Sequence, residues 1–264
     1  MGMFVREKKI FCGKEHMEVD IYQLSDRHLR KKKSQKREKV TAPAQKNLND
    51  KNAKRYLRQL IKTNFGSGDL HVTCTYRNEM LPETMEEAEK EVTNFIRRIQ
   101  YHCKKNKLPS LKYIIITEGV VCKGEKPKRI HHHIIMSKID RDVVENLWRK
   151  PKKKGEKIGE QIGFCNADRL QVDDDGGINA LVNYLSKDPQ GRKRWRSSQN
   201  LRKPEFAVAD RKWSKRKLAD IVGVHDDDRR FWEQKFHGWR MVSCESMYNE
   251  ISGWSIYLEF RRME

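Results

Sequence analysis

Three consecutive histidines, His131 to His133, stand inside an apolar run with the length of a buried β-strand, "KRIHHHIIMSK" (residues 128–138). Side chains alternate between the two faces of a strand, so His131 and His133 share one face and His132 points to the other. Two imidazoles two residues apart project side by side, as a pair of metal ligands does. The alternative is a chance run of histidines on a polar sheet face.

The strand that precedes the histidines supplies a third ligand type. Residues 111–120 are apolar up to Glu118, and a short turn over "CKGEKP" predicts a β-hairpin that brings Glu118 beside the histidine pair. Otherwise, Glu118 is a strand-end carboxylate that faces water. Two histidines and one carboxylate suit Mg²⁺ or Mn²⁺ with open positions, whereas a structural zinc site needs a fourth ligand or thiolates. The six cysteines are scattered singly, which favours neither structural zinc nor a disulfide framework.

A helix expected over residues 178–188, "INALVNYLSKD", carries Tyr184 and Lys187, three residues apart and on one side. A tyrosine hydroxyl is a weak nucleophile because its pKa is about 10. A nearby lysine and a divalent ion can help it attack a phosphodiester. The alternative is a core tyrosine with a snorkelling lysine.

The order of the expected elements predicts an α+β domain over residues 49–205. A helix within this range precedes the order β-α-β-β-α-β-α, close to the split βαβ (ferredoxin-like) pattern. One antiparallel sheet with helices on one face would leave the other face open for a site. The elements are expected at 49–65 (helix), 69–76 (strand), 81–106 (helix), 111–121 and 127–137 (strands), 140–150 (helix), 164–172 (strand) and 178–188 (helix).

Charge points to a polyanionic partner. The chain of 264 residues has 57 Lys and Arg against 37 Asp and Glu, a net charge of +20, and nucleic acid is the expected partner. Residues 1–48 are expected to form a basic N-terminal arm, partly disordered or helical. Residues 206–264 are expected to form a helix and hairpin that extend the catalytic sheet; the alternative is a separate origin-binding module. A basic stretch around a tryptophan fits a groove for single-stranded DNA, unless it is merely a solvated loop. Its members are Arg192, Lys193, Arg194, Trp195 and Arg196.

No apolar run approaches the roughly 20 residues of a membrane span, and no secretory signal is visible at the N-terminus. These features, with the scattered cysteines, favour a cytoplasmic protein without a membrane partner.

The motifs together resemble the HUH endonuclease superfamily, and within it the rolling-circle replication initiator (Rep) proteins of bacterial plasmids, phages and integrated elements. An alternating "HVTCTY" strand, Glu118 ahead of a His-x-His strand, and "YLSK" on a later helix occur in the family's order over roughly residues 68–205. The resemblance implies a ferredoxin-like HUH fold, His131, His133 and Glu118 as metal ligands, and Tyr184 as the nucleophile followed by Lys187.

The resemblance also implies a function. Such initiators nick one DNA strand at an origin, keep a 5′-phosphotyrosine link, leave a free 3′-OH for synthesis and later rejoin the ends. A relaxase or a single-tyrosine transposase would share this chemistry, but relaxases place the tyrosine before the histidines. A non-enzymatic DNA-binding regulator would not need Tyr184 or the histidines at all, and its binding would fall with salt without any cut product.

Two features depart from the family pattern. His132 stands where a bulky apolar residue is usual, and we expect a hydrogen-bonded core histidine there. The positions four residues from Tyr184 are Ala180 and Asp188, so one nucleophilic tyrosine per chain is implied. A second cleavage would then need another subunit in a dimer on DNA, or a water or hydroxyl. No P-loop motif is present, so a host or element-encoded helicase is expected to unwind the DNA.

Overall fold

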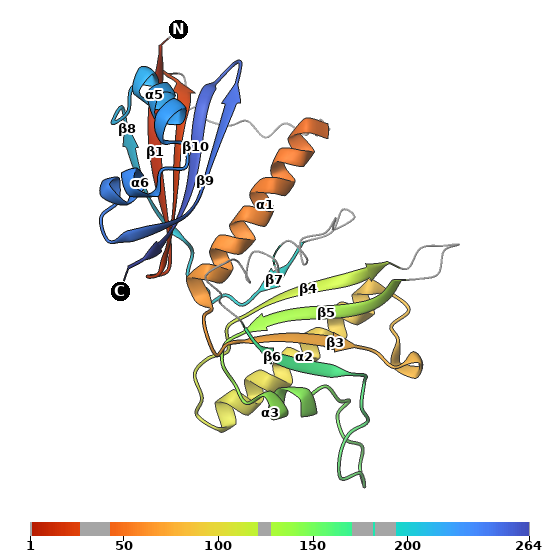
Figure 1. Cartoon of the computed structure of the whole chain (residues 1–264). Coiled ribbons are helices and arrows are strands. Elements are labelled where there is room, and N and C mark those ends of the chain that lie inside the picture. Colours follow the sequence, from red (N-terminus) through yellow and green to blue (C-terminus); the bar gives the residue numbers. More distant parts are fainter. Residues whose placement is uncertain (1, 27–42, 121–127, 171–181, 183–193, 264) are drawn as a thin grey trace. The chain divides into compact units, whose positions relative to one another are not determined.

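The computed structural model describes residues 2–26, 43–120, 128–170, 182 and 194–263. The chain divides into two compact units, a central unit (Asn64–Leu201) and a terminal unit (Met1–Thr63 with Arg202–Glu264). Each unit contains a five-stranded antiparallel sheet with few helices, so the predicted α+β class is confirmed (Figure 1). Among the helices of the described ranges, none combines the length and apolarity that a membrane crossing requires.

The sheet of the central unit has the strand order β6-β3-β5-β4-β7, and every described pairing in it is antiparallel. The chain passes from β3 through a short 3₁₀ helix and α2 to the β4–β5 pair, and then through α3 to β6. The bounds are β3 (Leu70–Thr75), η2 (Asn78–Met80), α2 (Met85–Lys105), β4 (Tyr113–Val120), β5 (Lys128–Met136), α3 (Arg141–Asn146), β6 (Cys165–Arg169) and β7 (Arg196–Ser197). The predicted turn over 122–127, turn over 173–177 and helix over 178–188 fall outside the described residues, apart from buried Val182.

Helix α2 begins at Met85, a turn later than the predicted start near Pro82. The hydroxyl of Thr84 accepts a hydrogen bond from the Glu87 amide at 3.2 Å and caps the helix. Its first turn is acidic and its last turn basic, as the helix dipole favours. One stripe of α2, which includes Val92, Phe95 and Ile99, is buried in the central core.

The two faces of this sheet differ as the alternation predicts. In β3, Val72 and Cys74 are buried in the core beneath α2, and Thr73 lies on the opposite face. We call this opposite face the site face, because it carries His131 and His133. We expected this face to be open, but part of it is covered: Ile114, Ile116 and Ile135 also belong to it and are buried.

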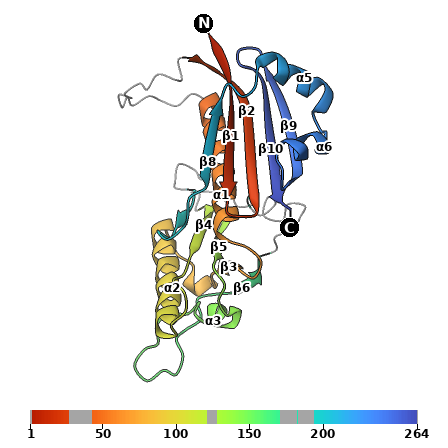
Figure 2. The ribbon, with the colours of Figure 1, turned by 90° about the vertical axis from the view of Figure 1, so that its left-hand side faces the viewer.

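The terminal unit differs from the prediction for residues 1–48. In place of an irregular basic arm, the structure has two long strands that pair with the C-terminal hairpin, in the sheet order β8-β1-β2-β10-β9 (Figure 2). The bounds are β1 (Met3–Cys12), β2 (His16–Ser25), α1 (Pro43–Asn64), β8 (Glu205–Asp210), α5 (Lys215–His225), α6 (Arg229–Lys235), β9 (Trp239–Asn249) and β10 (Gly253–Arg262). The C-terminal helix and hairpin are confirmed, but the hairpin joins β2 and does not extend the sheet of the central unit.

Charged groups explain why the N-terminal strands look like a tail in the sequence. Glu18 and Asp20 of β2 are buried, and both accept hydrogen bonds from Arg55 of α1, at 2.7 Å and 2.5 Å. Val19 and Ile21 alternate with them and pack into the core on the other face, with Trp232 and Phe260. The apolar residues in this part of β2 occupy only every second position, and the charged residues between them and after the strand make residues 1–48 polar on average.

Candidate metal centre

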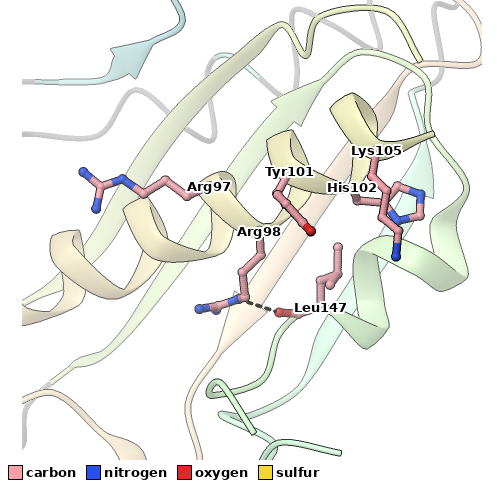
Figure 3. Close-up of a pocket in the computed structure, with 6 residues that line it drawn as sticks. All are labelled: Arg97, Arg98, Tyr101, His102, Lys105 and Leu147. Atoms are coloured by element: carbon pink, nitrogen blue, oxygen red, sulfur yellow. Dashed lines mark hydrogen bonds between the residues drawn. The ribbon is translucent and has the colours of Figure 1, made fainter. Parts of the chain in front are cut away.

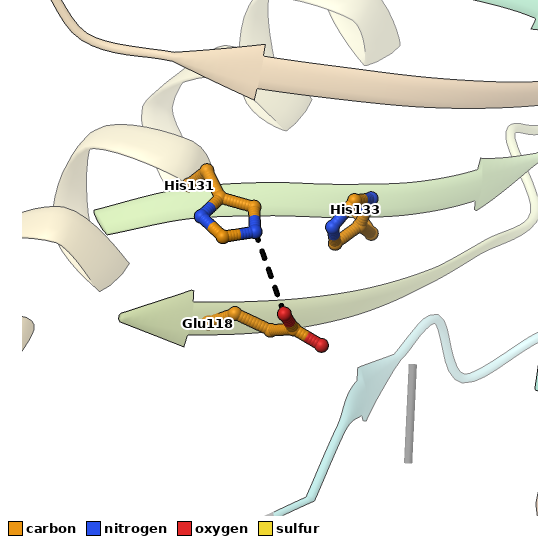
Figure 4. Close-up of side chains that lie close together, drawn as sticks. All are labelled: Glu118, His131 and His133. Carbon is orange, nitrogen blue, oxygen red and sulfur yellow. Dashed lines mark ion pairs between the residues drawn. The ribbon is translucent and has the colours of Figure 1, made fainter. Parts of the chain in front are cut away.

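Glu118, His131 and His133 come together on the site face, as predicted (Figure 4). Glu118 and His131 are directly paired across β4 and β5, and Glu118 Oε2 lies 3.4 Å from His131 Nε2. One ligand atom of each of the three residues lies within 4.8 Å of the others. Glu118 and His131 are half-buried and His133 is buried, so the cluster is partly screened from water.

A glycine next to Glu118 shapes this end of β4. The pairing register shifts between Glu118 and Val120, and Gly119 between them has φ of +129°. A Cβ at Gly119 would lie 2.6 Å from Ile130 Cα, so only glycine fits there. Such irregularities re-aim side chains next to active sites.

The donor set fits a divalent ion. Two ligand atoms of one ion lie at most about 4.4 Å apart, twice a metal–ligand distance of about 2.2 Å. Atoms that already lie within 4.8 Å of one another therefore need only a small shift to share an ion. Imidazole nitrogens and one carboxylate leave further coordination positions to water or a phosphate oxygen, as a catalytic ion requires.

Two residues of β3 that the sequence did not single out support His133. Thr73 is its cross-strand partner, and Thr73 Oγ1 lies 3.4 Å from His133 Nδ1, where the tautomer decides which group donates. The His71 ring stacks on the His133 ring with a centroid distance of 5.5 Å, and burial lowers the pKa of His71. A contact at one ring nitrogen of a ligand histidine fixes the ring orientation. The alternation in "HVTCTY" placed Thr73 and His71 on one face, but only the register of β3 against β5 shows which histidine they meet.

His132 lies on the core face and is completely buried. Its Nε2 lies 2.6 Å from Tyr76 Oη, and its Nδ1 lies 2.9 Å from Thr117 Oγ1. Burial lowers the pKa of His132 to about 3, so the ring is neutral. The interpretation as a hydrogen-bonded core histidine is confirmed.

Replacement of His132 by phenylalanine should destabilise the fold without affecting the metal site. The ring volume is kept, but the hydroxyls of Tyr76 and Thr117 lose their partners, which should lower the free energy of unfolding by about 2–4 kcal/mol. Urea denaturation measures this loss, and a Mn²⁺ titration of the folded variant should match wild type. A folded His132→Phe protein with strongly weakened Mn²⁺ binding would contradict this role.

The predicted site residues outside the cluster either contact another element or lie outside the described residues. Arg196 was expected to bind DNA, but its guanidinium donates hydrogen bonds to Thr93 Oγ1 at 3.0 Å and to the Glu89 carbonyl at 3.3 Å, both on α2. Arg196 pairs with Ile115 across β4 and β7, and Ile115 faces the core. The Arg196 side chain accordingly lies on the helix side of the sheet. The positions that were predicted but lie outside the described residues are Tyr184, Lys187, Arg192 and Lys193.

A separate pocket lies between α2 and the end of α3, on the helix side of the sheet (Figure 3). Arg98 donates a hydrogen bond to the Leu147 carbonyl at 3.1 Å in this pocket, and exposed Tyr101 lines it. The site face is the opposite face of the sheet, so this pocket is no part of the metal centre.

Comparison with known proteins gives a match to one family model. Residues 69–189, a little under half of the chain, match the family model "Replication-associated protein ORF2/G2P". No curated protein and no solved structure gives a significant match. The matched segment includes β3, the whole Glu118–His131–His133 cluster and Tyr184. The match supports a role in DNA replication, and the cluster within it fits a metal site.

Proposed function

We propose that this protein is an HUH endonuclease that initiates rolling-circle replication by nicking one DNA strand. The observation that carries the proposal is the Glu118–His131–His133 cluster, which lies within the segment that matches the replication-associated family. The match supports replication, and the cluster supports metal-dependent chemistry on a phosphate.

The topology of the central unit supports the fold assignment within this proposal. Its first six main elements, β3-α2-β4-β5-α3-β6, follow the β-α-β-β-α-β order, and its strands lie in the order β6-β3-β5-β4. This is the split βαβ arrangement, in which the strand that follows the first crossover lies two places from the first strand. The helices cover one face, and the cluster lies on the other.

In this function, Glu118, His131 and His133 would hold one Mg²⁺ or Mn²⁺ ion. The bound ion would supply Lewis-acid polarisation of the scissile phosphate. Thr73 and His71 would keep the His133 ring in its ligand orientation, and Gly119 would keep Glu118 beside His131. The ligands and the residues that support them would hold and orient the ion, but they would not attack the phosphate.

We assign the attack to Tyr184 because of its motif resemblance. The Tyr184 oxygen would form a bond to phosphorus while the bond from phosphorus to the 3′ oxygen breaks. The phenol proton is given up and the departing 3′ oxygen takes up a proton, so a 5′-phosphotyrosine and a free 3′-OH result. Lys187 would stabilise the negative charge that develops on the phosphate. Rejoining is the reverse reaction with a 3′-OH as the attacking group.

The partners follow from the same proposal. Single-stranded DNA at an origin is the substrate, and a helicase from the host or the element would unwind the duplex. A single nucleophilic tyrosine per chain favours a dimer on DNA, in which a second subunit makes the closing cut.

The test is strand cleavage by the full chain. Labelled single-stranded oligonucleotides that tile the protein's own genetic locus are incubated with Mn²⁺ or Mg²⁺, with and without EDTA, and run on a denaturing gel beside a protein gel. We expect a cut strand and a protein band that carries the label, both lost with EDTA. Binding across the whole locus without a cut under any metal condition would overturn the proposal and favour a DNA-binding regulator.

A further inference from the structure

The site face carries an exposed aromatic ring that no part of the proposed chemistry uses. Phe164 is 67% exposed, although its neighbours Ile162 and Cys165 are buried in the core. It immediately precedes β6, at the edge of the described sheet beside β3. A phenylalanine this exposed gains little from burial within the chain, so its position needs another reason.

The sheet register places Phe164 in line with the metal centre. Glu118 pairs with His131, and His131 pairs with Thr75. The amide of Thr75 donates a hydrogen bond to the Phe164 carbonyl at 2.8 Å, which continues the pairing of β3 with β6. Phe164 continues the pairing of β6, so with Cys165 facing the core it faces the other way, onto the site face; the bend at Gly163 ends this alternation and returns Ile162 to the core. Two strand spacings, about 10 Å, separate its backbone from that of His131.

The backbone holds Phe164 in a fixed place. The Phe164 carbonyl also accepts a hydrogen bond from Thr75 Oγ1 at 3.3 Å, and the Arg77 amide donates to the Ile162 carbonyl at 2.9 Å. Between them, a Cβ at Gly163 would lie 2.0 Å from the Thr75 carbonyl oxygen, so only glycine allows this close approach. An exposed ring on a backbone that is held in place is well suited to receive a flat partner.

Positive charge adjoins the ring along the chain. The loop from Arg149 to Gln161 is closed at its base by a bridge between these two residues and leads directly to Phe164. Its exposed cations are Lys152, Lys153, Lys154 and Lys157. The loop contains two acids, Glu156 and Glu160, and Glu160 is already paired with Arg77 at 3.0 Å. Lysines in a loop that leads to an exposed aromatic ring can supply phosphate contacts in addition to a stacking surface, as in proteins that bind single strands.

We propose that Phe164 is a base-stacking platform that holds an unpaired nucleotide of single-stranded DNA beside the Glu118–His131–His133 cluster. The inference rests on the proposed function and names the residue that positions the strand. A strand that runs across β4, β5 and β3 with a phosphate at the cluster passes over Phe164. The loop lysines bind its phosphates.

The test compares two strands of equal charge. Fluorescence anisotropy measures binding of the full chain to a labelled 20-nucleotide oligothymidylate and to an abasic strand of the same length. Wild type should bind the oligothymidylate more tightly, and Phe164→Ala should weaken that binding about tenfold while leaving abasic binding unchanged. Phe164→Trp should retain the wild-type affinity, because it restores a stacking ring. Equal oligothymidylate affinities for Phe164→Ala and wild type, or equal losses on both strands, would overturn the inference.

A matched control and a parallel assay separate this inference from the nuclease proposal. Tyr101 is 69% exposed on α2, on the other side of the sheet, so Tyr101→Ala should bind both strands as wild type does. An equal effect of Tyr101→Ala would assign the loss to general surface change and would count against Phe164. Cleavage is followed in the same preparations. Loss of base-dependent binding in Phe164→Ala without any wild-type cleavage would support the platform and refute the nuclease. Wild-type cleavage with unchanged binding in Phe164→Ala would support the nuclease and refute the platform.

Discussion

Alanine at His133 should lower the rate of metal-dependent strand cleavage by about 1,000-fold or more. The polarisation supplied by a bound ion is worth several kcal/mol, and each 1.36 kcal/mol is a tenfold change in rate. The described cluster has three ligands, so the loss of one leaves two. Loss of a residue that only supports a ligand weakens metal affinity by about 10- to 100-fold, and loss of a ligand should exceed this. The free Mn²⁺ signal in an electron paramagnetic resonance titration measures the affinity, and the gel assay measures the rate.

The half-buried His131 gives a second variant with less risk to the fold than buried His133. His131→Ala should show the same loss of Mn²⁺ affinity. His102 of α2 lies on the helix side and lines the separate pocket, so His102→Ala should keep wild-type affinity and rate. Unchanged Mn²⁺ binding in both His131→Ala and His133→Ala would show that the cluster is not the metal centre.

Local periodicity predicted which residues form the cluster. The alternation in residues 128–138 separated His131 and His133 from His132, and the short connection to residues 111–120 predicted that Glu118 would lie beside them. Both steps depend only on neighbours along the chain or across one hairpin. Thr73, His71 and Phe164 depend instead on the pairing of β3 with β5 and β6, which lie far apart in the sequence. Their places on the site face could not be read from the sequence for that reason.

The differences between prediction and structure have the same physical origin. Charged residues on β2 look like a solvated tail because their partner Arg55 lies 35 residues away from Asp20, on another element. Arg196 looks like part of a basic groove, but a strand points each residue to the face opposite its neighbours. One position therefore decides which face of the sheet a side chain reaches, and the Arg196 side chain reaches α2. Composition gives the charge of a segment but not the direction of any one side chain.

Phenylalanine at Tyr184 should remove the covalent protein–DNA band completely and reduce strand cleavage to background. The substitution deletes only the hydroxyl oxygen that we propose to bond to phosphorus, so no phosphotyrosine can form. Mn²⁺ affinity should not change, because Glu118, His131 and His133 are intact. This pattern is the converse of that expected for His133→Ala, which should lose the metal as well as the reaction.

Tyr101→Phe is the matched control, because it removes the same oxygen from an exposed tyrosine on α2. It should retain both the covalent band and the cleavage rate. Lys187→Ala should form the band about 100- to 1,000-fold more slowly, the usual effect of removing one group that stabilises developing charge. A covalent band that persists in Tyr184→Phe would move the nucleophile to another residue and leave the metal centre as a separate question. A band lost only from Tyr184→Phe, with metal binding intact, would instead separate the attacking group from the cluster that activates the phosphate.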